Sequence, residues 1–408
     1  MNSRYCIFCQ SILNATTKPE HIIPNSIGGR VTSRTIVCSD CNHEMGKQID
    51  EPFADDFKVI RNQLNIKTGS GQPPPTLRKV ATNQGMVDIL PGGVPQTSSP
   101  LIEPAQNGKG FAIKSHPDRW FELLLHQLYR HGYRPGDDIQ RWNLAANSER
   151  FFVDGDDGFV ISFGSLEHLR AIAKMAFESF AIHWCVEAHD PRLDQVRTFV
   201  RHGGQSSCVM WDYENRPSLP FQSLELGQAY HSVFVWSMGP GEPLAAAVTL
   251  FGGYCWTVEL AKEWWANPFA YAHAVNPLTE SIVGNHRVVD TIPGPRLDPN
   301  WANKRQPAVE AVRNHSANLF TLWYEMQKDK HLRSMIHRVV NQVMEREGWT
   351  DGEPWRDEMG FMLADPFATE YVRFKTRSPH MEPLNTDHLC QRIEAEYPIF
   401  YANKNLKS

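Results

Sequence analysis

Apolar residues recur at helical spacing near the start of the chain. They follow one another at steps of four, four, four, three and four, on one face of a helix: Met45, Ile49, Phe53, Phe57, Ile60 and Leu64. Pro52 interrupts this stripe, and proline is well tolerated in the first turn of a helix. The pattern therefore predicts two successive helices, the second beginning at the proline. Upstream, the apolar runs "HII" (21–23) and "TIVC" (35–38) predict two short strands that pair.

The hydrophobic pattern after residue 118 predicts a larger body of mixed helices and strands. Helices are expected over 118–132, from a Ser165 cap to Trp184, from Asp190–Pro191 to Gly203, and over 307–347. Three apolar stretches, 229–236, 244–251 and 254–260, predict consecutive antiparallel strands. The expected fold class is α+β, with a small N-terminal module followed by a mixed α/β body that contains an antiparallel sheet and several helices.

Proline and glycine gather between these two regions, in "GSGQPPP" and "LPGGVPQ". Within this stretch "LRKVA" and "MVDIL" flank "TNQG", which predicts a small hairpin. Three segments are therefore expected. Residues 1–65 form the N-terminal module and residues 66–118 form a connector. Residues 119–408 form a body for recognition, sensing or oligomerisation.

Composition narrows the class of protein. The chain has 41% hydrophobic residues and a net charge of −5, which indicates a folded protein and excludes a uniformly basic nucleic-acid coat. The N-terminus has no apolar run typical of a secretory leader, and no stretch reaches the roughly 18 apolar residues of a membrane span. A cytoplasmic protein without membrane contact is expected.

Two Cys-x-x-Cys pairs near the N-terminus predict a metal site. Cys6, Cys9, Cys38 and Cys41 supply four thiolates, the ligand set of a tetrahedral structural zinc. A closed four-sulfur site leaves no open position, so this zinc should stabilise the fold and take no part in chemistry. The other cysteines lie among apolar neighbours and are interpreted as buried free thiols: Cys185, Cys208, Cys255 and Cys390.

Candidate chemistry lies between and just after the cysteine pairs. His21 has an ordinary pKa of about 6.5, so its imidazole is largely neutral at pH 7 and can take a proton from water. Glu20 and Asn42 offer oxygen ligands suited to magnesium or manganese. A divalent ion beside a general base is a combination suited to hydrolysis of a phosphodiester. The alternative is an ordinary surface ion pair on a zinc-stabilised interaction module.

The motif "CIFC…EHIIPNSIGG…VCSDCNHEMG" resembles the zinc-containing HNH endonucleases of bacteria and phages. The resemblance covers about residues 4–60 and implies a ββα-metal fold. It also implies that His21 is the general base, and that Glu20 and Asn42 are the acidic residue and the last metal-binding residue.

The sequence departs from the family pattern at two places. The acidic residue is Glu20, where many members of the family have Asp. The family's middle asparagine, which orients the histidine, has no Asn equivalent, and Ser33 or Thr35 occupies that stretch. His43 is an alternative metal ligand to Asn42, although adjacent helical residues point about 100° apart. We interpret His43 as a solvated helix residue.

Local charge bears on how the substrate is held. From residue 1 to residue 62 there are seven Lys and Arg and seven Asp and Glu, so the module is neutral. Lys18, Arg30 and Arg34 lie close to the motif and are candidate substrate-binding residues; ordinary solvated charges are the equal alternative. A run of basic residues between 328 and 346 is a second candidate surface.

These observations favour a metal-dependent HNH endonuclease that acts on DNA, with RNA as an alternative substrate. The body would recognise substrate, respond to a small-molecule trigger or form a homo-oligomer, and a role in phage defence is a hypothesis from architecture alone. The competing hypothesis is a catalytically inactive zinc module that binds nucleic acid or protein.

Overall fold

The structure is a computed structural model. It describes residues 4–14, 16–82, 85–97, 101–104, 111–114, 164–205, 208–212, 229–288, 305–348, 362–363 and 366. Two compact units are present: Met1–Arg141 with Phe151–Phe320, and Trp142–Arg150 with Thr321–Ser408. The expected α+β class, with antiparallel sheets and several helices, is confirmed. The predicted helix over 118–132 and Cys390 lie outside the described residues. No described helix has the length and apolar character needed to cross a membrane.

The N-terminal module consists of a small hairpin followed by a run of helices. Its elements are β1 (Glu20–His21), η1 (Asn25–Ile27), β2 (Thr32–Ser33), α1 (Ser39–Met45), η2 (Gly46–Asp50), α2 (Glu51–Asp56) and α3 (Lys58–Gln63). Strands β1 and β2 are antiparallel, with Glu20 opposite Ser33 and His21 opposite Thr32. The prediction of a strand over 35–38 is wrong, because pairing ends at Ser33. The Ile36 carbonyl instead accepts a hydrogen bond from the Ile7 amide, 2.9 Å away.

The predicted apolar stripe forms the inner face of these helices. All six of its residues are buried: Met45, Ile49, Phe53, Phe57, Ile60 and Leu64. Pro52 lies in the first turn of α2, as predicted. Two features were not predicted. Residues 46–50 form a π-helix, and a break at Phe57 separates α2 from α3.

Gly28 and Gly29 turn the chain between the two strands. Gly28 has a φ of +95°, a conformation that glycine adopts without strain. A Cβ on Gly29 would lie 1.8 Å from the Ile23 carbonyl oxygen, so only glycine fits there. The Gly29 carbonyl in turn packs against Gly69, where an added Cβ would also lie 1.8 Å from it. This close backbone packing fixes the loop that follows His21.

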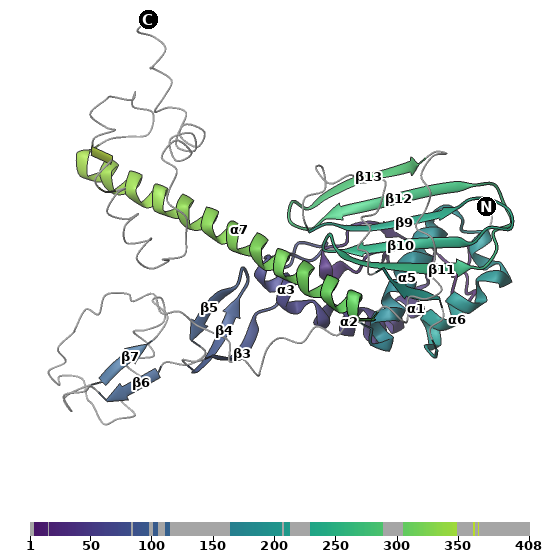
Figure 1. The fold of residues 1–408 in the computed structure, drawn as a ribbon, viewed down its shortest axis with the longest axis horizontal. Helices are drawn as coiled ribbons and strands as arrows, with labels where there is room; N and C mark the ends of the chain where they lie inside the picture. Colours follow the sequence, from purple (N-terminus) through teal and green to yellow (C-terminus); the bar gives the residue numbers. More distant parts are fainter. Residues whose placement is uncertain are drawn as a thin grey trace, which may run out of the picture. The chain divides into compact units, whose positions relative to one another are not determined.

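The body contains a six-stranded antiparallel sheet in the order β13-β12-β9-β10-β11-β8 (Figure 1). Its strands are β8 (Val209–Trp211), β9 (His231–Ser237), β10 (Leu244–Leu250), β11 (Tyr254–Ala261), β12 (Phe269–Asn276) and β13 (Ser281–Val288). The three consecutive strands predicted from the sequence are confirmed as β9, β10 and β11. The predicted hairpin is present as β3 (Leu77–Thr82) and β4 (Gly85–Leu90). A third strand, β5 (Val94–Thr97), pairs with β4. A separate pair comprises β6 (Leu101–Pro104) and β7 (Phe111–Lys114).

Helix α5 (Leu166–His183) connects the module to the sheet. The Ser165 hydroxyl accepts from the His168 amide, which confirms the predicted cap. The helix contacts β9, β10 and β11, and it also contacts η2 and α2 of the module (Figure 1). His168 lies in the shared core, with ring centroids 4.8 Å from Phe53 and 5.1 Å from Trp256. The module is therefore packed onto the body through α5.

The remaining helices follow the predicted pattern closely. The Asp190 carboxylate caps a 3-10 turn, η4 (Pro191–Leu193), which leads into α6 (Asp194–His202), and α6 ends at Gly203. Another 3-10 turn, η3 (Glu187–His189), precedes them. Helix α7 (Arg305–Glu347) is the predicted C-terminal helix.

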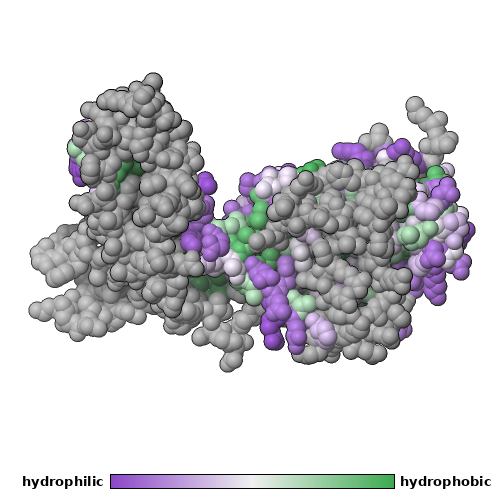
Figure 2. All heavy atoms as spheres, turned by 45° about the horizontal axis from the view of Figure 1, so that its top comes forward, coloured by the Kyte–Doolittle hydropathy of each residue, from purple (hydrophilic) through white to green (hydrophobic). Residues whose placement is uncertain are grey.

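The described residues are mainly polar on the face that Figure 2 draws, and hydrophobic residues gather near the middle of that view. Large exposed apolar side chains are scattered along the chain, including Ile12, Val186 and Met238. The apolar residues are therefore mostly inside, between the sheet, α5 and the module helices.

Candidate functional site

The four cysteines of the two predicted pairs come together. Their sulfur atoms all lie within 4.8 Å of one another, and Cys6, Cys38 and Cys41 are buried. The Cys38 sulfur also caps α1 by accepting from the Cys41 amide, which ties the second pair to the helix that follows. A hydrogen bond from the Cys41 thiol lowers the pKa of Cys6 to about 4, so a thiolate forms readily there. Four converging sulfurs fit a tetrahedral zinc.

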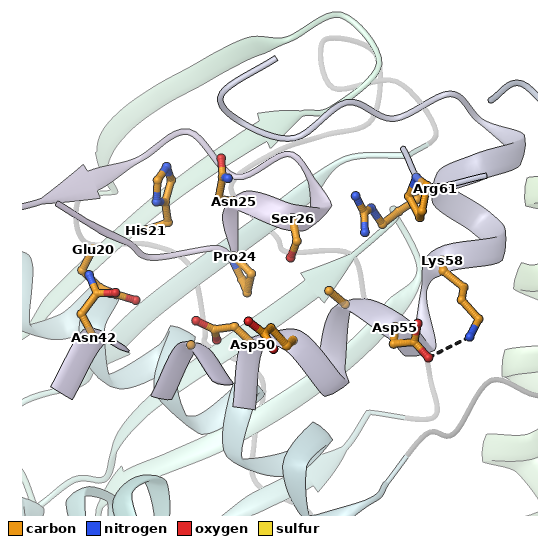
Figure 3. A pocket seen from close by; sticks show the side chains of 14 residues that line it. Glu20, His21, Pro24, Asn25, Ser26, Asn42, Asp50, Asp55, Lys58 and Arg61 are labelled. Atoms are coloured by element: carbon orange, nitrogen blue, oxygen red, sulfur yellow. Dashed lines mark hydrogen bonds and ion pairs between the residues drawn. The ribbon is translucent and has the colours of Figure 1, made fainter. Parts of the chain in front are cut away.

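A pocket of about 400 Å³ lies beside this cluster, between the hairpin and the helices (Figure 3). It brings together the three candidate catalytic residues, Glu20, His21 and Asn42. The other lining residues are Pro24, Asn25, Ser26, Gly46, Asp50, Glu51, Ala54, Asp55, Lys58, Arg61 and Pro75. Pairing of the His21 strand with a strand leading into Cys38 predicts that His21 and Asn42 face one another. Both residues line the pocket, but in Figure 3 the His21 ring points away from Asn42.

The His21 imidazole is suited to accept a proton. Burial lowers its pKa, the Lys174 charge lowers it further, and Asp50 opposes this in part. Because a pKa below the ordinary value of about 6.5 keeps the ring neutral at pH 7, a ring nitrogen carries a free lone pair.

The Asn42 side chain is anchored by one end only. Its Nδ2 donates to the Pro19 carbonyl at 3.2 Å, immediately before the strand that carries Glu20 and His21. This bond leaves the amide oxygen as a hard ligand on the pocket side. Asn42 follows Cys41 directly, so the cysteine cluster and the α1 cap fix its position.

Glu20 is held by a lysine from the body. The Lys174 ammonium on α5 lies 2.5 Å from Glu20 Oε1 and 2.9 Å from Asp50 Oδ2, and 3.8 Å from Glu178 Oε2. Lys174 is 1% exposed and Glu178 is fully buried. The cluster thus places three carboxyl groups around one cation, beneath the pocket.

Burial and neighbouring charge set the protonation of this cluster. Burial raises the pKa of Glu178 well above its ordinary value, and burial also raises the pKa of Glu20. Burial alone would lower the pKa of Lys174, but Asp50, Glu178 and Glu20 raise it well above the usual range. Lys174 therefore stays charged, and Glu178 is the carboxyl that most readily keeps its proton.

Asp50 and Lys174 were not identified from the sequence. For Asp50 a signal existed, because Asn42, Gly46 and Asp50 recur at steps of four and all line the pocket. They form a polar stripe beside the apolar stripe of the same helices. For Lys174 there was no local signal, since it lies 154 residues from Glu20.

The three basic residues predicted to bind substrate lie elsewhere, and none of them lines the described pocket. Arg30 forms an ion pair with Glu280 at 2.6 Å, and Arg34 donates to the Thr17 carbonyl at 2.8 Å. The Lys18 side chain is exposed. Their role in substrate binding stays a prediction.

Ser33 and Thr35 occupy the stretch of the family's middle asparagine, and their side chains form a hydrogen bond with each other. The Ser33 and Thr35 hydroxyl oxygens are 3.0 Å apart. Among the described residues no hydrogen bond joins either of them to the His21 ring. His43 is exposed and does not line the pocket, which agrees with its interpretation as a solvated helix residue.

Comparison with known protein families finds a match in the N-terminal module. Residues 6–58 match the sequence model of an HNH endonuclease family, so the match covers a segment of the chain. No curated protein and no solved structure matches the chain. The matched segment contains all four cysteines and all three candidate catalytic residues.

Proposed function

We propose that the protein is a divalent-metal-dependent endonuclease that hydrolyses phosphodiester bonds in DNA. The observation that supports this most directly is one pocket that gathers a neutral histidine, an amide oxygen and a carboxylate beside a four-cysteine cluster. Residues 6–58 match an HNH endonuclease family, which fits a nucleic-acid substrate.

Each of the three candidate catalytic residues has a defined part in this proposal. His21 accepts the proton of the attacking water at its free ring nitrogen. The Asn42 amide oxygen and Glu20 Oε2 bind the divalent ion, because Lys174 already holds Glu20 Oε1. Bound magnesium or manganese offsets negative charge on the phosphoryl and departing oxygens. The four cysteines hold zinc and keep Asn42 in place.

The function is tested by cleavage of plasmid and single-stranded DNA, and of RNA, by the full chain with magnesium or manganese. His21→Ala should lose about a hundredfold to ten-thousandfold in rate, the usual contribution of a general base. Its zinc content and nucleic-acid affinity should be unchanged. His43→Ala is the matched control, because this second histidine is exposed and lies outside the pocket, and its rate should equal that of the wild type.

Asn42→Ala separates metal binding from proton transfer. Its rate should also fall, and part of it should return at higher magnesium or manganese, since a lost ligand weakens ion affinity. His21→Ala should show no such recovery. If His21→Ala cleaves as fast as the wild type, or if the wild type cleaves no nucleic acid, the inactive binding module becomes the better hypothesis.

A further inference from the structure

Arg61 differs from the other buried cations of the described residues. Four cationic side chains are buried there: Arg61, Arg170, Lys174 and Arg197. Lys174 is surrounded by carboxylates, and Arg170 and Arg197 donate to backbone carbonyls. The Nε atoms of Arg61 and Arg197 are both buried without a hydrogen-bond partner, but the Nη atoms of Arg197 bind Asp194 and the Ala188 carbonyl. Within the described residues, no ion pair or side-chain hydrogen bond reaches the Arg61 guanidinium.

The position of Arg61 is well defined. It lies on α3, where its amide donates to the Phe57 carbonyl and its carbonyl accepts from the Ile66 amide, both at 2.9 Å. The residue is 6% exposed. Its guanidinium lines the pocket and points from the helix toward the side where Ser26 lies (Figure 3). The side chain therefore faces the same cavity as His21 and Asn42.

The nearby acid does not neutralise Arg61. Asp55 lines the pocket too, but its carboxylate forms an ion pair with Lys58 at 2.8 Å. Burial lowers the pKa of Arg61, and Asp55 only partly opposes this. Arginine nevertheless stays protonated in proteins. A buried and unpaired charge is costly, so a site that retains one is prepared for an anion.

The chemistry of the cavity favours a phosphate as that anion. A guanidinium presents two parallel N–H groups that match phosphate oxygens. In Figure 3, Arg61 lies at the opposite end of the pocket from Glu20 and Asn42, where the divalent ion is expected. A phosphate at Arg61 is therefore a neighbour of the one that reacts.

We propose that Arg61 binds the nucleic-acid backbone at a phosphate that flanks the scissile one, as a substrate-binding residue. This inference rests on the proposed nuclease function. It also gives a module with seven basic and seven acidic residues a contact to a polyanion, since a hydrogen bond to a charged group is stronger than one between neutral groups.

The test compares Arg61→Gln and Arg61→Lys with the wild type, using Arg78→Gln as the matched control. Arg78 is an exposed arginine on β3 and does not line the pocket. The first measurement is the salt dependence of oligonucleotide binding in EDTA. The second is the steady-state kinetics of cleavage in magnesium, which gives KM and kcat. A third measurement, the rise in melting temperature with pyrophosphate, requires no cleavage activity.

Arg61→Gln should weaken binding and raise KM by about tenfold to a hundredfold, since a charge-assisted contact is lost. The slope of log affinity against log salt should fall by about 0.9, the loss of one phosphate contact. The kcat should change less than threefold, because a flanking contact is the same in ground and transition states. Arg61→Lys should keep the salt slope but lose part of the affinity. Arg78→Gln should resemble the wild type.

Stability separates binding from a structural role. Arg61→Gln should melt at or above the wild-type temperature without ligand, and should lose the stabilisation by pyrophosphate. Unfolding of Arg61→Gln, or an unchanged salt slope and unchanged pyrophosphate effect, would overturn the inference. A wild type that is stabilised by pyrophosphate through Arg61 but cleaves nothing would instead contradict the nuclease function and leave the anion site standing.

Discussion

Lys174→Met tests the contact between the body and the candidate active site. The substitution removes the ammonium that lies 2.5 Å from Glu20 and 2.9 Å from Asp50, and it keeps an unbranched apolar side chain in a buried position. Two carboxylates at the edge of the pocket then have no cation beside them. The helix itself should be unaffected, because methionine forms helices nearly as well as lysine.

The expected loss can be stated from the geometry. Breaking a buried ion pair by removing one partner costs about 3–5 kcal/mol, a large share of the roughly 5–15 kcal/mol that stabilises a domain. The loss should depend on pH. Without Lys174 the pKa of Glu20, already raised by burial, rises further. An acid with a raised folded pKa destabilises the fold as pH rises from its unfolded pKa, about 4.3, towards the folded pKa. The penalty should thus be smaller at pH 5 than at pH 7.

The assay is thermal unfolding of the full chain at both pH values, followed by circular dichroism. Lys58→Met is the matched control, because its ion pair with Asp55 is largely exposed and such pairs contribute about 0–1 kcal/mol. The double variant Lys174→Met, Glu20→Gln should recover part of the loss, since it removes one unpaired charge. Equal melting temperatures for Lys174→Met and wild type at pH 7, or no recovery in the double variant, would refute the reasoning.

Two further predictions concern the zinc content of the chain and the stability of the fold in acid. Elemental analysis should find close to one zinc per chain, and this zinc should resist EDTA. Cys38→Ser should lose the zinc and unfold the module, whereas Cys185→Ser, at a half-buried cysteine outside the cluster, should retain it. A full zinc content in Cys38→Ser would contradict the four-sulfur site. Burial lowers the pKa of His231 and of His273 to about 4, below the unfolded value of about 6.5. Above pH 6.5 both histidines are neutral in the folded and in the unfolded chain, so they cost the fold nothing. As pH falls from 6.5 to 4, the free energy of unfolding should decrease by up to about 3 kcal/mol for each histidine. A wild-type melting temperature that stays constant over this range would contradict this prediction.

The elements that could be predicted are those with a local signal. The apolar stripe from Met45 to Leu64, the Ser165 cap and the alternation in β9 to β11 each depend on neighbours in sequence, and each formed as expected. The apolar run over 35–38 led to a wrong prediction of a strand, because Ile36 and Val37 are fully buried beside the first cysteine pair without pairing in a sheet. Apolar residues packed in a loop give the same pattern as a buried strand.

The parts of the site that sequence missed depend on contacts between distant segments. Lys174 and Glu178 are buried charged residues one turn apart on α5, and the other partners of Lys174 lie on β1 and η2. Only the packing of α5 against the module brings them together. Asp50 differs from Lys174 in this respect, because its spacing of four from Gly46 and of eight from Asn42 is a local signal, although the segment that it ends is π-helical.

Charge along the pocket relates the two proposals. At one end three carboxyl groups surround a single lysine, so acidic groups outnumber basic ones there: Glu20, Asp50 and Glu178. This excess of acidic groups favours a divalent cation beside Glu20 and Asn42. At the other end the unpaired Arg61 favours an anion. A backbone that lies across the pocket would thus place one phosphate on the ion and the next on the guanidinium. Because Lys174 comes from α5, the body contributes to the charge around the proposed divalent-ion site of the module.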